Sequence, residues 1–212
     1  MASYLRGSIS VLEFGAGIGT LAIEWEKQTG LKPECLETDA NQQQIVSNRG
    51  FVCYRSFAEL NKMFDGIYSS NVFEHIENDF EAFQAVHSIL AEHGTLVVFV
   101  PAFICLFSAL DRSLGHFRRY RKNDLIGKAK RAGFQIIDCH YFDSIGSLAW
   151  FIALRSSKGD GGKLASPASL RFYDKWVFPV SRFLDRLFMR LLVGKNLLLI
   201  PKKKPVAIRE KP

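Results

Sequence analysis

The stretch VLEFGAGIGT, residues 11–20, constrains the fold of this chain more than any other feature of the sequence. The apolar run over residues 9–14 predicts a buried strand, and residues 18–28 predict a helix. Three glycines stand between them, at Gly15, Gly17 and Gly19. Glycines at a strand-to-helix turn let the backbone approach a ligand closely, so the pattern predicts a ligand-binding loop in an α/β fold.

The spacing of these glycines argues against a dinucleotide as the ligand. A dinucleotide fingerprint places its third glycine three residues after the second, which is the position of Thr20. Here the third glycine, Gly19, comes two residues after the second. Glu13 precedes the loop, and its carboxylate would repel a pyrophosphate. The site therefore suits a ligand that carries a positively charged amino-acid group.

Strands and helices alternate along most of the chain, which predicts a parallel sheet covered on both faces. Further strands are predicted at ECLET, FVCY, FDGIYSS, GTLVVFVP, FQIIDCHYF and NLLLIPKKK, the last of them at an edge. Further helices are predicted at NQQQIVSNRG, at 79–91, and at 123–131 with Asn123 or Asp124 as its cap. A long loop is expected after Pro101, and residues 144–193 are interpreted as a helical insertion.

A length of 212 residues fits one domain, 1–212, with the insertion within it. The four cysteines have no metal-type or paired spacing, so they are interpreted as reduced core thiols of a cytoplasmic protein, and no metal site is expected. The longest uncharged run, residues 94–110, is interrupted by Pro101. It is interpreted as a buried strand followed by a loop rather than as a membrane span.

Charge is divided unevenly between the two halves of the chain. Residues 1–100 contain 6 Lys or Arg and 13 Asp or Glu, a net charge of −7, whereas residues 101–212 contain 22 and 8, a net charge of +14. An acidic half suits a cationic ligand, and a basic half suits an anionic partner or surface. The alternative is that both are ordinary solvated faces.

These motifs together resemble those of class I S-adenosylmethionine-dependent methyltransferases. VLEFGAGIG resembles their first motif, and LETDAN, FDGIYSSNVFEHI, ILAEHGTLVVFVP and AGFQII resemble later ones, over about residues 9–142. The resemblance implies a doubly wound, mostly parallel seven-stranded Rossmann-like sheet with an antiparallel last strand. It also implies S-adenosylmethionine as the cofactor and methyl transfer as the activity. Family members usually have helices before the first strand that cover the cofactor, and this sequence is short there.

The resemblance also implies roles for individual residues around the cofactor. Glu13 would hold its amino group, and Gly15, Ala16 and Gly17 would border its methionine part. Asp39, followed by Ala40, would accept both ribose hydroxyls, with Glu37 as the rival, because the register is open by two residues. Positions near the adenine and the mouth of the site would be Ser56, Phe57, Asn71, Val72 and His75.

The stretch GHFRRY is the predicted acceptor site, and it resembles a subgroup with a G-H-x-R-R-Y loop tied to lipid or saccharide metabolism. Arg118 and Arg119 are suited to grip an anion, with Tyr120 beside them. His116 is the first candidate for a general base and His75 the second. The expected acceptor is a small, lipid-linked or saccharide molecule, and anionic. The alternative is a solvated surface loop.

Residues 181–193 form a basic amphipathic pattern, in which Arg182, Arg186 and Arg190 recur every four residues. This pattern fits packing on the sheet, a homodimer interface, or peripheral contact with a membrane surface. The basic half also favours an RNA methyltransferase as an alternative function, although no RNA-binding motif supports it. A binding protein that retains the fold without catalysis is the other alternative.

Overall fold

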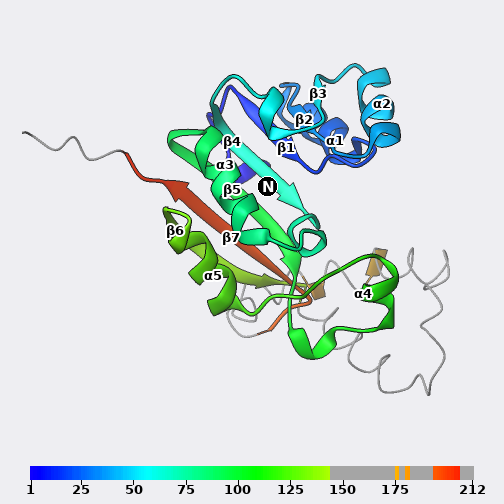
Figure 1. The fold of residues 1–212 in the computed structure, drawn as a ribbon, viewed down its shortest axis with the longest axis vertical. Helices are drawn as coiled ribbons and strands as arrows, with labels where there is room; N and C mark the ends of the chain where they lie inside the picture. The colour runs from blue at the N-terminus through cyan, green and yellow to red at the C-terminus, as the bar shows by residue number, and fades with distance from the viewer. Residues whose placement is uncertain (144–174, 177–179, 182–192, 206–212) are drawn as a thin grey trace, which may run out of the picture.

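The computed structural model describes residues 1–143, 175–176, 180–181 and 193–205 (Figure 1). Within these residues, seven strands form one sheet in the order β3-β2-β1-β4-β5-β7-β6. Strands β1 to β5 are paired in parallel, and β7 pairs antiparallel with both β5 and β6. The predicted doubly wound sheet with an antiparallel last strand is confirmed. The predicted edge position of that strand is wrong, because β7 lies between β5 and β6.

The strands are β1 Val11–Phe14, β2 Glu34–Leu36, β3 Cys53–Tyr54, β4 Phe64–Ser70, β5 Leu90–Pro101, β6 Phe134–Phe142 and β7 Asn196–Lys203. The α-helices are α1 Thr20–Thr29, α2 Ala40–Asn48, α3 Asp79–Ile89, α4 Ala109–Ser113 and α5 Lys122–Arg131. Short 3₁₀ helices are η1 Ala2–Tyr4, η2 Phe57–Glu59, η3 Phe73–His75 and η4 Ile104–Leu106.

Two predictions about local structure after β5 are wrong. The expected loop contains η4 and α4, and α4 forms because Ser108 and Asp111 make a reciprocal capping box at its start. Helix α5 begins at Lys122 with Arg121 as its N-cap, so neither Asn123 nor Asp124 caps it. The capping box explains the start of α4, whereas no side chain caps the start of α5.

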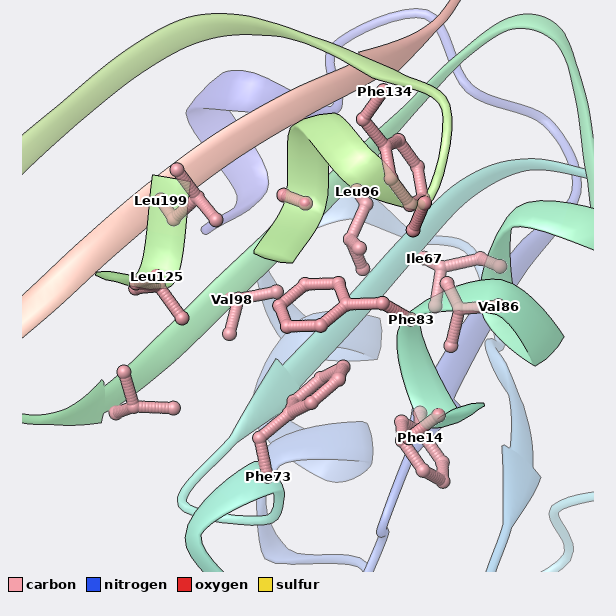
Figure 2. Close-up of a cluster of buried hydrophobic side chains, with 14 of the residues drawn as sticks. Phe14, Ile67, Phe73, Phe83, Val86, Leu96, Val98, Leu125, Phe134 and Leu199 are labelled. Atoms are coloured by element: carbon pink, nitrogen blue, oxygen red, sulfur yellow. The ribbon is translucent and has the colours of Figure 1, made fainter. Parts of the chain in front are cut away.

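The larger hydrophobic core lies on the sheet face that α3 and α5 cover (Figure 2). Phe83 of α3 is fully buried there, and its ring lies 4.4 Å from that of Phe73 and 6.4 Å from that of Phe134. Phe73 in turn meets Phe14 at 5.6 Å between ring centroids. Because Phe73 belongs to η3, this row of aromatic rings anchors η3 to the core and so determines the positions of the residues after Phe73.

The opposite face is covered by α1 and the first residues of the chain. Trp25 of α1 stacks on Tyr68 of β4 with 4.9 Å between ring centroids, and Leu5 belongs to the same buried cluster. All four residues of β1 are consequently buried. Strands covered on both faces have continuous hydrophobic sequence rather than alternation, as the stretch before the glycines does.

All four cysteines are free thiols, but only Cys35 and Cys139 are buried. Cys53 is half-buried and Cys105 is exposed, so the core position expected for all four is wrong. Among the described residues, no helix is both long enough and apolar enough to cross a membrane. The predicted insertion at 144–193 and the basic amphipathic pattern lie almost entirely outside the described residues.

Candidate functional site

A cavity of about 720 Å³ opens where β1, β2 and β4 reach their carboxyl ends. Ligands of open α/β sheets bind at this edge. Residues expected at the cofactor line this cavity: Gly15, Gly17, Glu37, Ser56, Phe57, Asn71, Val72 and His75. Its lining also includes Gln42, Arg55, Asn78 and Glu81, which the sequence interpretation did not assign. The structure therefore brings together residues that lie up to 71 positions apart in sequence, Phe14 and Ala85.

The two glycines at the cavity are required for different reasons. Gly15 has φ +77°, and a Cβ there would lie 2.2 Å from Cγ2 of Val72. Gly17 has φ +56°, but a Cβ there would meet only Oε1 of Gln42, at 3.5 Å. Glycine is therefore required at position 15 for two reasons, the left-handed backbone and the close approach of Val72. At position 17 it is required mainly for the left-handed backbone.

Of the two acidic residues after β2, Glu37 lines the cavity and Asp39 does not. Oε2 of Glu37 accepts the Gly17 N–H at 2.7 Å, and its Oε1 accepts the Asp39 N–H at 3.0 Å. Asp39 is the N-cap of α2, where its Oδ1 accepts the N–H groups of Asn41 and Gln42 at 2.9 Å. Ala40 is the first residue of that helix. Both oxygens of Glu37 still have lone pairs for a ligand hydroxyl.

Glu13 and Ala16 are buried and are not among the described residues that line the cavity. Oε2 of Glu13 accepts the Tyr68 hydroxyl at 3.0 Å. Burial raises the pKa of Glu13 to about 8, against the lowering effect of the Tyr68 hydrogen bond. Ala16 packs in a small cluster with Cys35 and Val46. In this structure the carboxylate of Glu13 bonds to Tyr68 of β4 and does not line the ligand cavity.

A second cavity of about 440 Å³ lies beside the first. Asn71 and His75 line both cavities, so the two meet at the end of β4 and the start of η3. The second cavity is bordered by the start of β7, the end of β5 and the segment around α4. Its further lining residues are Phe99, Pro101, Leu110, Asp111, Leu114, His116, Arg119, Lys195 and Asn196.

The residues of GHFRRY point in different directions. Arg118 binds the Glu77 carbonyl and the Asp79 carboxylate, at 2.6 and 3.0 Å, and is not among the residues lining either cavity. Tyr120 is buried, and its hydroxyl donates to Oδ2 of Asp79 at 2.8 Å. The expectation that Tyr120 faces the acceptor is therefore wrong, because its ring packs into the core.

His116 and Arg119 do reach the second cavity, and Asp111 holds both. Nε of Arg119 donates to Oδ1 of Asp111 at 2.8 Å, and Nδ1 of His116 lies 3.0 Å from the same oxygen. Burial alone would raise the pKa of Asp111, but hydrogen bonds from Arg119 and Ser108 outweigh it and lower that pKa. An ionised Asp111 accepts the Nδ1–H of His116, which leaves the lone pair of this ring on Nε2.

Glu74, which precedes His75, is a further residue that the sequence interpretation did not assign. It is fully buried, and neither of its carboxylate oxygens has a hydrogen-bond partner among the described residues. Burial raises the pKa of Glu74 to about 7, although its own backbone N–H and Arg119 act in the opposite direction. The available signal was an acidic residue directly after the apolar pair Val72 and Phe73. Its burial depends on the packing of η3, which the sequence does not display.

His75 follows Glu74 in the chain and lies against His116 in the structure. The rings of His75 and His116 meet edge to face with 4.6 Å between their centroids. Burial and the neighbouring His116 lower the pKa of His75, and a backbone hydrogen bond at Gly115 opposes this shift. One ligand atom from each of Glu74, His75 and His116 can be chosen so that all lie within 4.8 Å of one another.

The sheet order, the glycine loop and the cavity at its edge define a Rossmann-like protein of the methyltransferase type. Residues 1–138 match the family described as "Methyltransferase domain". The chain belongs to this family. No curated protein has a matching sequence.

Solved structures of methyltransferases share the fold. An S-adenosylmethionine-dependent methyltransferase from Archaeoglobus fulgidus is 19% identical, with a TM-score of 0.63 over 95% of this chain and 89% of its own. A cyclopropane synthase from Mycobacterium tuberculosis is 17% identical, with a TM-score of 0.59 over 95% and 82%. A phosphoethanolamine N-methyltransferase from Haemonchus contortus, in complex with S-adenosyl-L-methionine, is 15% identical, with a TM-score of 0.58 over 92% of this chain and 49% of its own.

S-adenosylmethionine is the cofactor, and the described residues fit it. The cavity volume falls within the range of about 300–1,000 Å³ that is usual for small-molecule sites. Gly15 and Gly17 form part of its lining, and a Cβ on Gly15 would clash with Val72, which also lines the cavity. Glu37 presents a carboxylate to the cavity, as recognition of a ribose diol requires, and Phe57 presents an apolar ring.

Proposed function

We propose that this protein transfers a methyl group from S-adenosylmethionine to an anionic small-molecule, lipid-linked or saccharide acceptor. The observation that carries the proposal is the second cavity, which shares Asn71 and His75 with the cofactor cavity. An acceptor bound there would meet the cofactor at these two residues. Its described lining holds two cations, Arg119 and Lys195, against one carboxylate, Asp111, so a negatively charged acceptor group is favoured.

Each group of residues would contribute in its own way. Glu37, with the backbone of Gly15 and Gly17, would hold the cofactor, which supplies a methyl group already activated as a sulfonium. Enzymes that use such a donor can rely on positioning the acceptor and excluding water. Asp111 would orient His116 toward the acceptor, and the sequence-based expectation of His116 as general base remains a prediction.

Methyl-labelled S-adenosylmethionine and fractionated cell extract test the proposal. We expect label in an anionic small-molecule, lipid or saccharide fraction, and no label when the Gly15→Ala variant replaces the parent. Label in RNA instead would favour the RNA methyltransferase alternative. Cofactor binding by calorimetry without labelled product in any fraction would favour a binding protein that retains the fold.

A further inference from the structure

The buried carboxylate of Glu74 is the strongest unexplained feature of the site. A fully buried carboxylate without a hydrogen-bond partner is costly, and such groups are normally paired with a cation or bound to a metal. The charge of Arg119 lowers the pKa of Glu74, but Nε and Nη1 of Arg119 donate to Asp111 and to the Ala102 carbonyl. The carboxylate therefore lacks a direct partner where it meets the two histidines.

We propose that Glu74, His75 and His116 bind a first-row divalent metal ion such as Zn²⁺ at the boundary between the two cavities. Two imidazoles and one carboxylate are a common ligand set for such ions. Ligand atoms bound about 2.0–2.2 Å from a tetrahedral ion lie about 3.3–3.6 Å apart. The three groups lie within 4.8 Å of one another, so side-chain rotations must bring them closer together when the ion binds.

The contacts behind the histidines support a metal rather than a chance cluster. Metal-bound histidines usually donate their second ring N–H to a carboxylate or a backbone carbonyl, which orients the ring. Nδ1 of His116 lies 3.0 Å from Oδ1 of Asp111, which leaves Nε2 for the ion. The Gly115 backbone favours the protonated form of the His75 ring. Asp111 is itself held by Ser108 and Arg119.

The position of the ion would also narrow the class of acceptor. His75 is exposed, so the ion can reach the site from solvent. His75 and His116 both line the second cavity, where the proposed acceptor would bind. A metal here would have an open coordination position toward that cavity, where an acceptor hydroxyl or carboxylate oxygen would bind. This use of the site rests on the proposed function, whereas the metal site itself does not. Metal binding and base catalysis by His116 exclude each other, because both use the same ring lone pair.

Metal titration of the purified chain tests the site without requiring any activity. We expect calorimetry to show one Zn²⁺ bound per chain. Co²⁺ should give visible absorption bands without thiolate charge transfer, which distinguishes this site from adventitious binding at the exposed Cys105. His75→Asn and Glu74→Gln should each weaken Zn²⁺ binding more than about 100-fold. Asp111→Asn should weaken it by about 10–100-fold, as expected for an outer partner.

His93→Asn is the matched control, since His93 is exposed, lies outside the cluster, and has φ +63°, which asparagine tolerates. It should bind Zn²⁺ like the parent. His75 is also exposed, so His75→Asn keeps the test valid even if Glu74→Gln fails to fold. No Zn²⁺ binding by the parent, or equal binding by the parent and His75→Asn, would overturn the metal site. S-adenosylmethionine binding, measured on the same samples, reports separately on the proposed function.

Discussion

Two loops at the same edge of the sheet use their residues in opposite ways. The glycine loop, residues 15–19, follows β1 and faces the ligand with its backbone, because Gly15 and Gly17 line the cofactor cavity. The basic loop, residues 115–121, follows β5 and α4, and its charged side chains mostly serve the fold. Arg118 binds Asp79, Tyr120 is buried, and Arg119 pairs with Asp111.

This difference shows why function was easier to infer from one loop than from the other. A left-handed backbone position requires glycine, so the requirement is visible in the residue type itself. An arginine is compatible with a solvated surface, a buried ion pair or a ligand contact, and the residue type does not distinguish among them. Of the adjacent Arg118 and Arg119, only Arg119 lines the second cavity.

The largest effect is expected from Arg119→Ala in the basic loop. Arg119 and Asp111 are both nearly fully buried, so removing one partner leaves an unpaired charge. The free energy of unfolding should fall by about 3–5 kcal/mol. Arg118→Ala is the control, because its ion pair with Asp79 is partly solvated and should contribute less than about 1 kcal/mol. Urea denaturation measures both variants, and equal losses would contradict the contrast between the two arginines.

The next largest effect is expected within the glycine loop. Gly15→Ala combines a strained φ with a clash at Val72, and it should lower stability by about 2–4 kcal/mol. Gly17→Ala has only the strained φ, because its Cβ would have space, and should cost about 1–2 kcal/mol. Thermal unfolding and calorimetry with S-adenosylmethionine should rank Gly15→Ala as the more severe change. The reverse order would mean that the close approach to Val72 is unimportant.

A smaller effect should distinguish Glu37 from Asp39. Glu37→Ala removes a carboxylate that lines the cavity and accepts the Gly17 N–H, so cofactor affinity should fall by about 1–3 kcal/mol. Asp39→Ala removes the N-cap of α2, which should lower stability by about 0.5–2 kcal/mol and leave cofactor affinity nearly unchanged. Calorimetry at matched folded fractions separates the two results. A larger loss of affinity in Asp39→Ala would restore Asp39 as the ribose ligand.

The last prediction concerns the buried carboxylate of Glu13, which precedes the glycine loop, and the dependence of stability on pH. Burial raises the pKa of Glu13 from 4.5 to about 8, with Tyr68, Glu37 and the Ala22 backbone as smaller influences. Between these two values the unfolded chain binds fewer protons at this residue than the folded chain. The free energy of unfolding should therefore fall as pH rises from about 5 to 8.

Glu13→Gln should reduce that fall by at least about 1 kcal/mol, because the amide does not titrate. Urea denaturation of parent and variant across this pH range provides the measurement. If the free energies of unfolding of the parent and of Glu13→Gln changed in parallel with pH, Glu13 would be ionised in the folded protein. If Glu13→Gln changed cofactor affinity but not stability, Glu13 would contact the cofactor, as the sequence resemblance implied.

The sequence alone determined the strands of the sheet and the position of the cofactor loop, and its resemblance to a known family indicated the cofactor. Continuous apolar runs predict buried strands, and the glycines between residues 15 and 19 report a backbone requirement that depends only on neighbouring residues. Five motifs in order then indicated the family. Local and periodic patterns of this kind can be recognised from the residue types alone.

Only the tertiary structure decided which side chains face the cavities. β7 lies inside the sheet because it pairs with β5 and β6, which are distant from it in sequence. Glu37 rather than Asp39 lines the cofactor cavity because Asp39 caps α2. Glu74 meets His116, 42 positions later, because Phe73 anchors η3 to the core. Such contacts depend on packing between distant segments, and no local pattern in the sequence records which way a polar side chain will turn.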